Sequence, residues 1–315
     1  MHVESVNVHY LSRKAGIIRR NVEYIKYCLM MISRSEYDVV FIKYFKGCSL
    51  LKLLYPDKIF IMDIRTGAVN NKKHVRVLED CLLKLESKIF KNITVVSESL
   101  ANKLNLKKYH VVPLGALPLS DRKNLLVPSD EVNLVYVGTL TGRKLENSIE
   151  AVFLFKERNP RVKIRYFIIG DGATSDKKII VDLIDRLDLK EIVSFEGFVA
   201  HHELNKFFEI AHIGVAYIPV TEFYNVQPST KIYEYCLSSI PVIATNTMEN
   251  IRIINKHIGV VAADNPKDFS FGIEELLQKI KNHDLNFDEE NISSFRWPAV
   301  VADLEIYIRK CCDIL

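Results

Sequence analysis

The segment from Gln227 to Tyr235, QPSTKIYEY, combines a helix start with a cation and a carboxylate one turn apart. Pro228 and Ser229 are residue types that begin helices, and the free backbone N–H groups of a helix start attract anions. Lys231 lies in the first turn, where it opposes the helix dipole, and Glu234 follows three residues later on the same face. The spacing suits a nucleoside diphosphate, with Lys231 neutralising phosphate and Glu234 accepting hydrogen bonds from ribose hydroxyls. An ordinary salt bridge between the two side chains is the structural alternative.

A second candidate loop, Gly138-Thr-Leu-Thr-Gly-Arg143, directly follows the strand-like run Leu134–Val137. Glycines between a strand and a helix let the backbone approach a phosphate, and the helix start that follows favours an anion. Arg143 adds a guanidinium whose donors match phosphate oxygens. A purely structural strand end explains these glycines equally well when the loop is taken alone.

Two weaker loops follow other strand-like runs. Gly170-Asp-Gly172 lacks the GxGxxG spacing of dinucleotide-binding folds, which disfavours hydride-transfer chemistry, and a simple turn is the structural alternative. Phe195–Val199 precedes a helical segment with His201 and His202. Adjacent residues on a helix do not share a face, so this histidine pair indicates a solvated helix start rather than a metal site.

Strand-like and helical runs alternate along the chain, which is the pattern of βαβ units. The predicted strands are Asp38–Ile42, Ile59–Met62, Ile93–Val96, Leu134–Val137, Ile164–Ile169, Val193–Phe195, Ile213–Ile218, Pro241–Ala244 and Val260–Val261. The predicted helices are Val75–Phe90, Ser148–Arg158, Asp176–Leu187, His202–Ala211 and Thr230–Ser238. We therefore predict an α/β fold with two doubly wound, Rossmann-like domains joined near residue 125.

Ligands of such sheets bind beyond the carboxyl ends of the strands, so functional residues should directly follow strands. In the first half, Asp63 and Arg65 follow the predicted strand Ile59–Met62 and are candidates for orienting an acceptor or a sugar. A structural Asp–Arg pair is the alternative reading of the same residues.

The order GTLTGR, IIGDG, FEGFV, PSTKIYEY and IPVIATN resembles family 4 of the GT-B glycosyltransferases, the group 1 enzymes, most closely over residues 132–262. The resemblance implies two Rossmann-like domains facing across a cleft. It also implies that Arg143 and the loop from Gly138 contact a diphosphate, although Thr139 stands where the family has an Arg. The backbone near Phe198 and Val199 would meet the base, and Glu234 matches the second Glu of the family's EX7E motif.

The first Glu of that motif corresponds to Val226, so recognition of the donor sugar requires other groups. Glu222 and Asn225 are the nearby candidates. In the N-terminal half, Val96–Leu100 and Val111–Gly115 match the family, whereas its opening strand and glycine-rich loop are reduced to Val6–Tyr10 and the basic segment 13–20.

The resemblance implies an acceptor-side domain over residues 1–125, shortened and basic, a donor-binding domain over 126–295, and a closing helix over 296–315 that crosses back. The candidate donor-binding residues are Gly138, Thr139, Arg143, Gly170, Asp171, Gly172, Phe198, Val199, Glu222, Asn225, Ser229, Thr230, Lys231 and Glu234. The candidate catalytic residues are Asp63, Arg65 and Lys231.

Charge divides the chain unevenly. Residues 1–125 carry 22 basic and 11 acidic residues, net +11, whereas the remaining residues carry 21 and 28, net −7. The basic half suits nucleic acid, an anionic membrane surface or a phosphorylated substrate, or it is a plain solvated surface. Six cysteines without a CxxC pair, and no signal-like or spanning apolar run, predict a cytoplasmic protein with reduced thiols.

The implied reaction is transfer of a sugar from a UDP- or GDP-linked donor to an acceptor hydroxyl, with retention of anomeric configuration and no metal or other cofactor. It fits cell-surface polysaccharide or glycoconjugate assembly, with a saccharide or lipid-linked acceptor, at the inner face of the membrane and without nucleic acid as a partner. Two alternatives are a nucleotide-sugar epimerase of the same architecture and a non-catalytic nucleotide-sugar-binding subunit.

Overall fold

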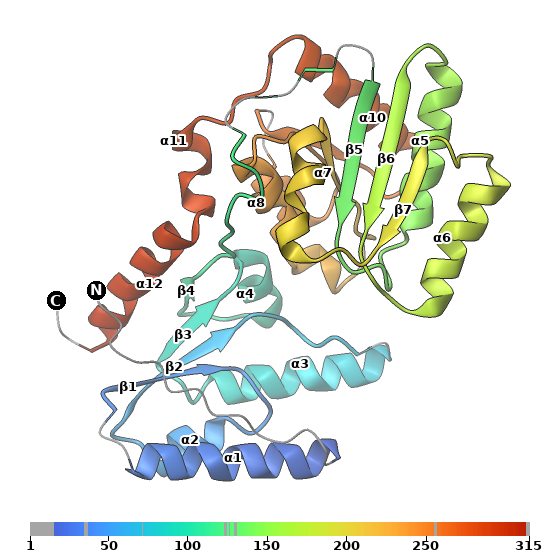
Figure 1. The fold of residues 1–315 in the computed structure, drawn as a ribbon. Helices are drawn as coiled ribbons and strands as arrows, with labels where there is room; N and C mark the ends of the chain where they lie inside the picture. Colours follow the sequence, from blue (N-terminus) through green and yellow to red (C-terminus); the bar gives the residue numbers. More distant parts are fainter. Residues whose placement is uncertain are drawn as a thin grey trace. The chain divides into compact units, whose positions relative to one another are not determined.

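The computed structural model describes residues 16–34, 37–70, 72–122, 125, 127–128, 131–254 and 257–312. The chain divides into two compact units, each with its own sheet (Figure 1). The first unit holds the residues up to Val95, Leu104–Val111 and the residues from Ile306 onward; the second holds Val96–Lys103 and Val112–Glu305. The predicted opening strand Val6–Tyr10 and the start of the basic segment at 13–15 lie outside the described residues.

The first unit is built on four parallel strands in the order β1-β2-β3-β4. Their bounds are Val39–Lys43, Ile59–Ile64, Asn92–Val95 and His110–Val111. Three helices accompany them, α1 (Ile17–Arg34), α2 (Ser49–Leu54) and α3 (Lys73–Ser87). The last turns of α12 (Trp297–Cys311) also belong to this unit, where Tyr307 stacks on His110 with ring centroids 4.4 Å apart.

The second unit is built on six parallel strands in the order β10-β9-β8-β5-β6-β7. Their bounds, from β5 to β10, are Glu131–Val137, Lys163–Ile169, Val193–Gly197, Ile213–Ala216, Val242–Thr245 and Gly259–Ala262. The chain builds outward from β5 to β7 and then returns to add β8 on the other side of β5. This reversal between β5 and β8 is the topological switch point at which doubly wound folds bind ligands.

Helices cover both faces of this second sheet. The helices that contribute to the cores on these faces are α5 (Leu145–Arg158), α6 (Thr174–Arg186), α7 (Asn205–Ile210), α8 (Thr230–Leu237), α9 (Met248–Ile253), α10 (Pro266–Lys281) and α11 (Glu289–Ile292). The helix α4 (Glu98–Leu104) contributes to neither core. Side chains of β5 alternate between two cores because successive strand residues point to opposite faces. Leu134 and Tyr136 join the core under α5, α6 and α10, whereas Val135 and Val137 join the core under α7 and α8.

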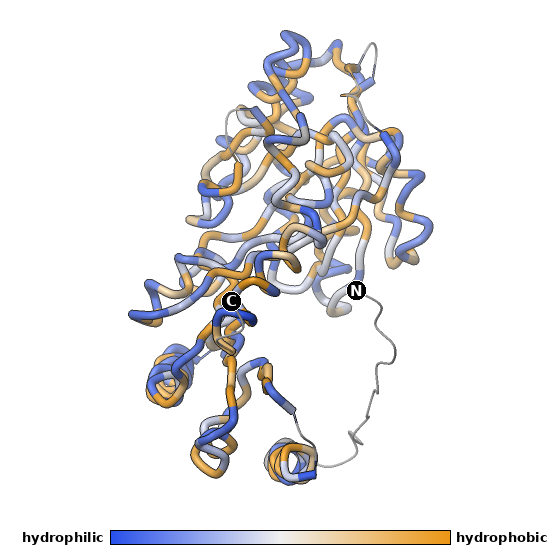
Figure 2. Tube along the Cα trace, turned by 90° about the vertical axis from the view of Figure 1, so that its left-hand side faces the viewer, coloured by the Kyte–Doolittle hydropathy of each residue, from blue (hydrophilic) through white to orange (hydrophobic). Residues whose placement is uncertain are grey.

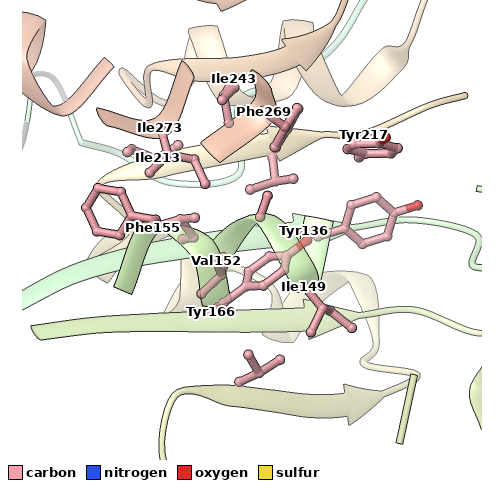
Figure 3. Close-up of a cluster of buried hydrophobic side chains, with 14 of the residues drawn as sticks. Tyr136, Ile149, Val152, Phe155, Tyr166, Ile213, Tyr217, Ile243, Phe269 and Ile273 are labelled. Atoms are coloured by element: carbon pink, nitrogen blue, oxygen red, sulfur yellow. The ribbon is translucent and has the colours of Figure 1, made fainter. Parts of the chain in front are cut away.

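Large aromatic and aliphatic side chains fill the core under α5 and α10. Figure 3 shows Tyr136, Tyr166 and Phe155 from the strand and helix layers packed among isoleucines, with Phe269 nearby. Two buried hydroxyls in this core are paired, because Tyr166 and Ser148 lie 3.0 Å apart. Figure 2 shows that hydrophilic residues occupy much of the outer loops and helices of this unit. The sheet is therefore closely packed on this face, and this packing supports the loops at its carboxyl edge.

Helix starts in the second unit are of two kinds. Asn265 accepts from the Asp268 backbone N–H at the start of α10, and Thr247 accepts from the Asn250 N–H at the start of α9. Neither α5 nor α8 has a side-chain cap of this kind. The uncapped starts of α5 and α8 leave backbone donors for a ligand, since the first N–H groups of a helix have no partner within the helix.

The described residues include no helix long and apolar enough to cross a membrane. Within the same residues, no three His, Cys, Asp or Glu side chains gather in an arrangement that could hold a metal ion. All six cysteines are free thiols.

Candidate functional site

Two loops interlock at the carboxyl edge of the second sheet, one following β5 and the other following β6. The Gly138 N–H donates to the Ile169 carbonyl at 3.0 Å, and the Leu140 N–H donates to the Asp171 carbonyl at 3.0 Å. Gly170 has φ +154°, and a Cβ at this position would lie 1.8 Å from the Gly138 carbonyl oxygen. A glycine is therefore required at 170 by the close approach of the two backbones, beyond the needs of a simple turn.

The loop after β5 forms one wall of two adjoining pockets. The β5–α8 pocket, about 320 Å³, is lined by Gly138, Thr139, Arg143, Ser229, Thr230 and Lys231, together with Tyr224 and its neighbours. The β5–β6 pocket, about 350 Å³, is lined by the same Gly138, Thr139 and Lys231, and by Gly170, Asp171, Phe198 and Val199. The structure thus brings ten of the predicted donor-binding residues around one continuous site at the switch point.

The start of α8 carries the side chains that the sequence singles out most sharply. Ser229 occupies the N-cap position in an extended conformation, but its side chain caps no backbone N–H. Lys231 and Glu234 form an ion pair, with 25% of the Lys231 side chain and 13% of the Glu234 side chain exposed. The salt bridge named as the structural alternative is therefore present. Because Lys231 lines both pockets, its ammonium stays available to an anion bound there.

Arg143 is positioned by an aromatic ring that the sequence reading missed. Its guanidinium lies over the Tyr224 ring, 4.6 Å from the centroid, and both residues line the β5–α8 pocket. Such a cation–π contact restricts a long side chain while leaving its donors free for phosphate oxygens. The sequence feature that could have indicated Tyr224 is its position, because it lies between β8 and α8, in a connection that leaves the switch point.

Thr139 contributes backbone rather than side chain to the local framework. The buried Tyr136 hydroxyl donates to the Thr139 carbonyl at 2.6 Å, and burial raises the pKa of this tyrosine above its usual value. The phenol therefore stays protonated and holds the loop at neutral pH. Gly172, the last glycine of the second loop, packs against Thr141 outside the lining of either pocket.

The far end of the β5–β6 pocket is open and partly aromatic. Phe198 is 78% exposed, although it is a large apolar side chain directly beside the pocket. Asp171 forms an ion pair with Lys177 at 2.9 Å, and the hydrogen bond from Lys177 lowers the pKa of the Asp171 carboxyl. An exposed ring beside a stable carboxylate is suited to a flat, hydrogen-bonding group such as a nucleoside base.

Three positions near the expected sugar end do not line either pocket. Val226 is buried with 6% exposure, and its carbonyl accepts a hydrogen bond from the Ser97 hydroxyl at 3.0 Å. The Asn225 side chain accepts from the Met248 N–H at 2.8 Å and so supports the start of α9. Glu222 is exposed. The assignment of Glu222 and Asn225 to the donor sugar therefore stays a prediction.

A buried Asp63 and a partly exposed Arg65 form an ion pair in the first unit. Asp63 lies inside β2 and not after it, which corrects the expected end of this strand at Met62. Arg65 donates to one Asp63 carboxylate oxygen at 2.7 Å, and Thr94 donates to the other at 2.7 Å. With 4% exposure and both oxygens engaged, Asp63 is built to hold Arg65 rather than to meet a substrate.

The sequence of residues 131–279 matches the protein family described as glycosyl transferases group 1. No curated protein matches the sequence of the chain. The matched region covers β5 through most of α10 and therefore contains all the residues of both pockets.

Solved structures extend the similarity to nearly the whole chain. Sucrose-phosphate synthase from Thermosynechococcus elongatus superposes with a TM-score of 0.72 at 14% identity, covering 97% of this chain and 81% of that one. HepE from Anabaena in complex with UDP gives 0.69 at 13%, covering 93% and 82%. A glycosyltransferase from Rickettsia africae gives 0.67 at 17%, covering 97% and 84%.

At such low identity these likenesses establish the fold alone, and it is the predicted α/β fold of GT-B glycosyltransferases. The family match carries the assignment further for the unit that contains the pockets. Residues 131–279 of the second unit match the glycosyl transferases group 1, within a chain that has the GT-B fold.

Proposed function

We propose that the chain transfers a sugar from a nucleotide-diphosphate sugar to an acceptor hydroxyl. One observation carries the proposal: Lys231, Arg143 and the uncapped start of α8 line one pocket together with the glycine loop after β5. Cations and free backbone donors around a glycine loop at a switch point suit a diphosphate. The similarity in fold to HepE, solved in complex with UDP, supports the same ligand class.

The two pockets divide the donor between them. The β5–α8 pocket, with Lys231 and Arg143, would hold the diphosphate and lead to the sugar. The β5–β6 pocket, with Phe198 and Val199, would hold the nucleoside. Glu234 would keep the Lys231 ammonium in place and accept from the ribose hydroxyls. UDP and GDP are the two donors that we propose for the first tests.

Electrostatic stabilisation of the leaving group would supply much of the rate. The diphosphate gains negative charge as the bond to the sugar breaks, and Lys231, Arg143 and the helix starts would stabilise that charge. These groups are fixed before reaction, so no metal ion is needed for the proposal. We further propose retention of anomeric configuration, on the resemblance to family 4 alone. Arg65, held by Asp63, is the group proposed to orient the acceptor.

The proposal is tested by substituting Lys231 and measuring both donor hydrolysis and sugar transfer. Lys231→Ala should lower turnover by about 10²–10³-fold, the usual effect of removing one donor that stabilises a developing anion. Lys190→Ala is the matched control, because Lys190 pairs with Asp185 on the surface of the same unit and is 68% exposed. Equal turnover by the two variants would overturn the assignment of Lys231.

A non-catalytic nucleotide-sugar-binding subunit is the second candidate, and Val226 is the observation that favours it. The position expected to carry a sugar-contacting carboxylate instead carries a buried apolar side chain. Tight donor binding without turnover by any acceptor would support this candidate, whereas donor-dependent transfer would exclude it.

We propose a lipid-linked or polymeric acceptor of cell-surface assembly, reached by peripheral contact with an anionic membrane at its inner face. Leu50, Leu53 and Leu54 of α2 are all exposed, and α1 carries Arg20 and Lys26 beside apolar residues. Basic and apolar groups on neighbouring helices suit an interfacial site. Sedimentation with phosphatidylglycerol vesicles should fall as salt rises; binding that ignores salt would contradict an electrostatic contact.

A further inference from the structure

The first unit has a pocket of about 640 Å³ lined by five lysines from three separate segments. Lys84 and Lys88 come from the end of α3, Lys91 from the turn that enters β3, and Lys107 and Lys108 from the turn that enters β4. Because both turns precede their strands, the pocket lies at the amino edge of the sheet. Arg65, the acceptor-side candidate, follows β2 at the opposite, carboxyl edge.

The charge of this lysine pocket is uncompensated by the described part of the protein. None of the residues that line it is acidic. None of the five ammonium groups forms a salt bridge or donates a hydrogen bond to a described residue, whereas the ammonium of Lys46, on the same unit, pairs with Glu79. Five like charges around one hollow repel one another and cost stability, so a bound anion would relieve the repulsion.

Helix electrostatics explain only part of the cluster. Lys84 and Lys88 lie at the carboxyl end of α3, where cations stabilise the helix dipole. Lys91, Lys107 and Lys108 lie in turns and gain nothing from α3. The turn before β4 is fixed by Asn105, whose φ of +53° ends α4 in a left-handed conformation. Three of the five charges are thus left without a structural reason.

We propose that the lysine pocket binds an anionic saccharide chain that carries carboxylate, sulfate or phosphate groups. The five flexible ammonium groups suit several spaced anionic groups better than one planar, bidentate ligand. Three of the apolar lining residues, Phe90, Ile93 and Leu104, are buried, and only Leu106 is partly exposed, so the lining offers little apolar surface for insertion into a bilayer. The concave shape and the positive charge of the pocket therefore favour a soluble polyanion over a membrane surface.

Under the proposed glycosyltransferase function, the bound saccharide would be the acceptor polymer, and the lysine pocket would hold it at a distance from its reacting end. That reading rests on the proposed function, but the binding itself does not. Retention of a polymer at the amino edge would raise the effective concentration of its end at the carboxyl edge of the same sheet.

The test measures binding of a fluorescent heparin oligosaccharide by anisotropy at low and moderate salt. The triple variant Lys88→Gln, Lys107→Gln and Lys108→Gln should bind about tenfold more weakly than wild type, with a smaller salt dependence. The control variant Lys43→Gln, Lys72→Gln and Lys73→Gln removes the same charge from exposed positions of the same unit and should stay within about twofold of wild type.

Three outcomes would overturn the proposal. They are equal binding by wild type and the pocket variant, equal loss in both triple variants, and binding of anionic vesicles without binding of the oligosaccharide. Dextran, as a neutral polymer, should not bind. A UDP titration of the same samples reports on the second unit separately, so absent UDP binding would contradict the proposed function and leave the anion result standing.

Discussion

At the scale of residues, Lys231 and Glu234 show how one pair can be both structural and functional. The ion pair holds the ammonium at the first turn of α8, against the helix dipole, and this placement is unfavourable without a nearby anion. Glu234 supplies that anion in the ligand-free protein. A bound diphosphate would add a second one on the pocket side of Lys231.

Phe198 provides a residue-scale prediction that separates the nucleoside from the diphosphate. Phe198→Ala should weaken UDP binding by about 1–3 kcal/mol, the usual contribution of a base stacked on an aromatic ring, and leave pyrophosphate binding unchanged. The free energy of unfolding should hardly change because the side chain is 78% exposed. Calorimetric titration of both ligands checks this, and an equal loss for both ligands would place the base elsewhere.

The sequence predicted the phosphate-facing residues better than the sugar-facing and acceptor-facing ones. Lys231, Arg143 and Gly138 could be predicted because they lie at helix starts and strand ends, which are local properties of the sequence. Tyr224 escaped prediction because its contact with Arg143 joins two connections that are distant in sequence. Asp63 was misplaced because β2 continues two residues beyond its continuous apolar run.

At the scale of elements, the site depends on two loops whose backbones touch. Gly170→Ala should lower the free energy of unfolding of the second unit by about 1–3 kcal/mol more than Gly197→Ala, because the added Cβ meets the Gly138 carbonyl. Gly197 is the matched control: its φ is +66°, but a Cβ there meets nothing within 4 Å. Urea denaturation monitors both variants, and equal losses would show that the loop contact is not tight.

The junction of β8 with β5 predicts a pH dependence. Burial, and secondarily the Arg122 guanidinium, lower the pKa of His212 from 6.5 to about 4, and its neutral Nδ1 accepts from the Asn133 N–H at 3.0 Å. As the pH falls from 6.5 toward 4, His212 therefore binds a proton in the unfolded chain but stays neutral in the folded chain. Stability should drop over this window by up to about 1.4 kcal/mol per pH unit.

His212→Asn isolates this contribution because an amide oxygen can accept the same hydrogen bond without titrating. The difference in unfolding free energy between wild type and variant should shrink as the pH falls through the window. A difference that stays constant from pH 7 to pH 4 would contradict the assigned pKa.

Most predicted elements are confirmed to within a few residues, whereas the helices α1, α2, α4, α9 and α10 were not predicted. α8 begins at Thr230 as predicted, and the six strands of the second sheet all form. α1 was missed because its apolar run Tyr27–Ile32 is continuous, which hides the helical period. Among the side chains described in α1, Ile32 alone is buried. Little of the helix packs against a core, so its sequence carries only a weak helical period of apolar residues.

At the scale of the whole molecule, charge and topology divide the work between the units. The switch point between β5 and β8 explains why the donor candidates gather in the second, acidic part of the chain. Five of the basic residues in the first part of the chain line the lysine pocket. Strand order could not be predicted from one sequence, because it depends on pairings between distant segments. The bounds 1–125, 126–295 and 296–315 remain predictions about domain organisation.

The central claim is that the second unit binds a nucleotide-diphosphate sugar through Lys231. The most direct measurement is a thermal-shift titration of wild type, Lys231→Ala and Lys190→Ala with UDP, GDP and their sugar conjugates. A ligand that binds only the folded state raises the melting temperature in step with its affinity. We predict stabilisation of wild type and Lys190→Ala by a UDP or GDP ligand, and its loss in Lys231→Ala. Stabilisation of no protein by any of these ligands, or equal stabilisation of all three, would contradict the claim.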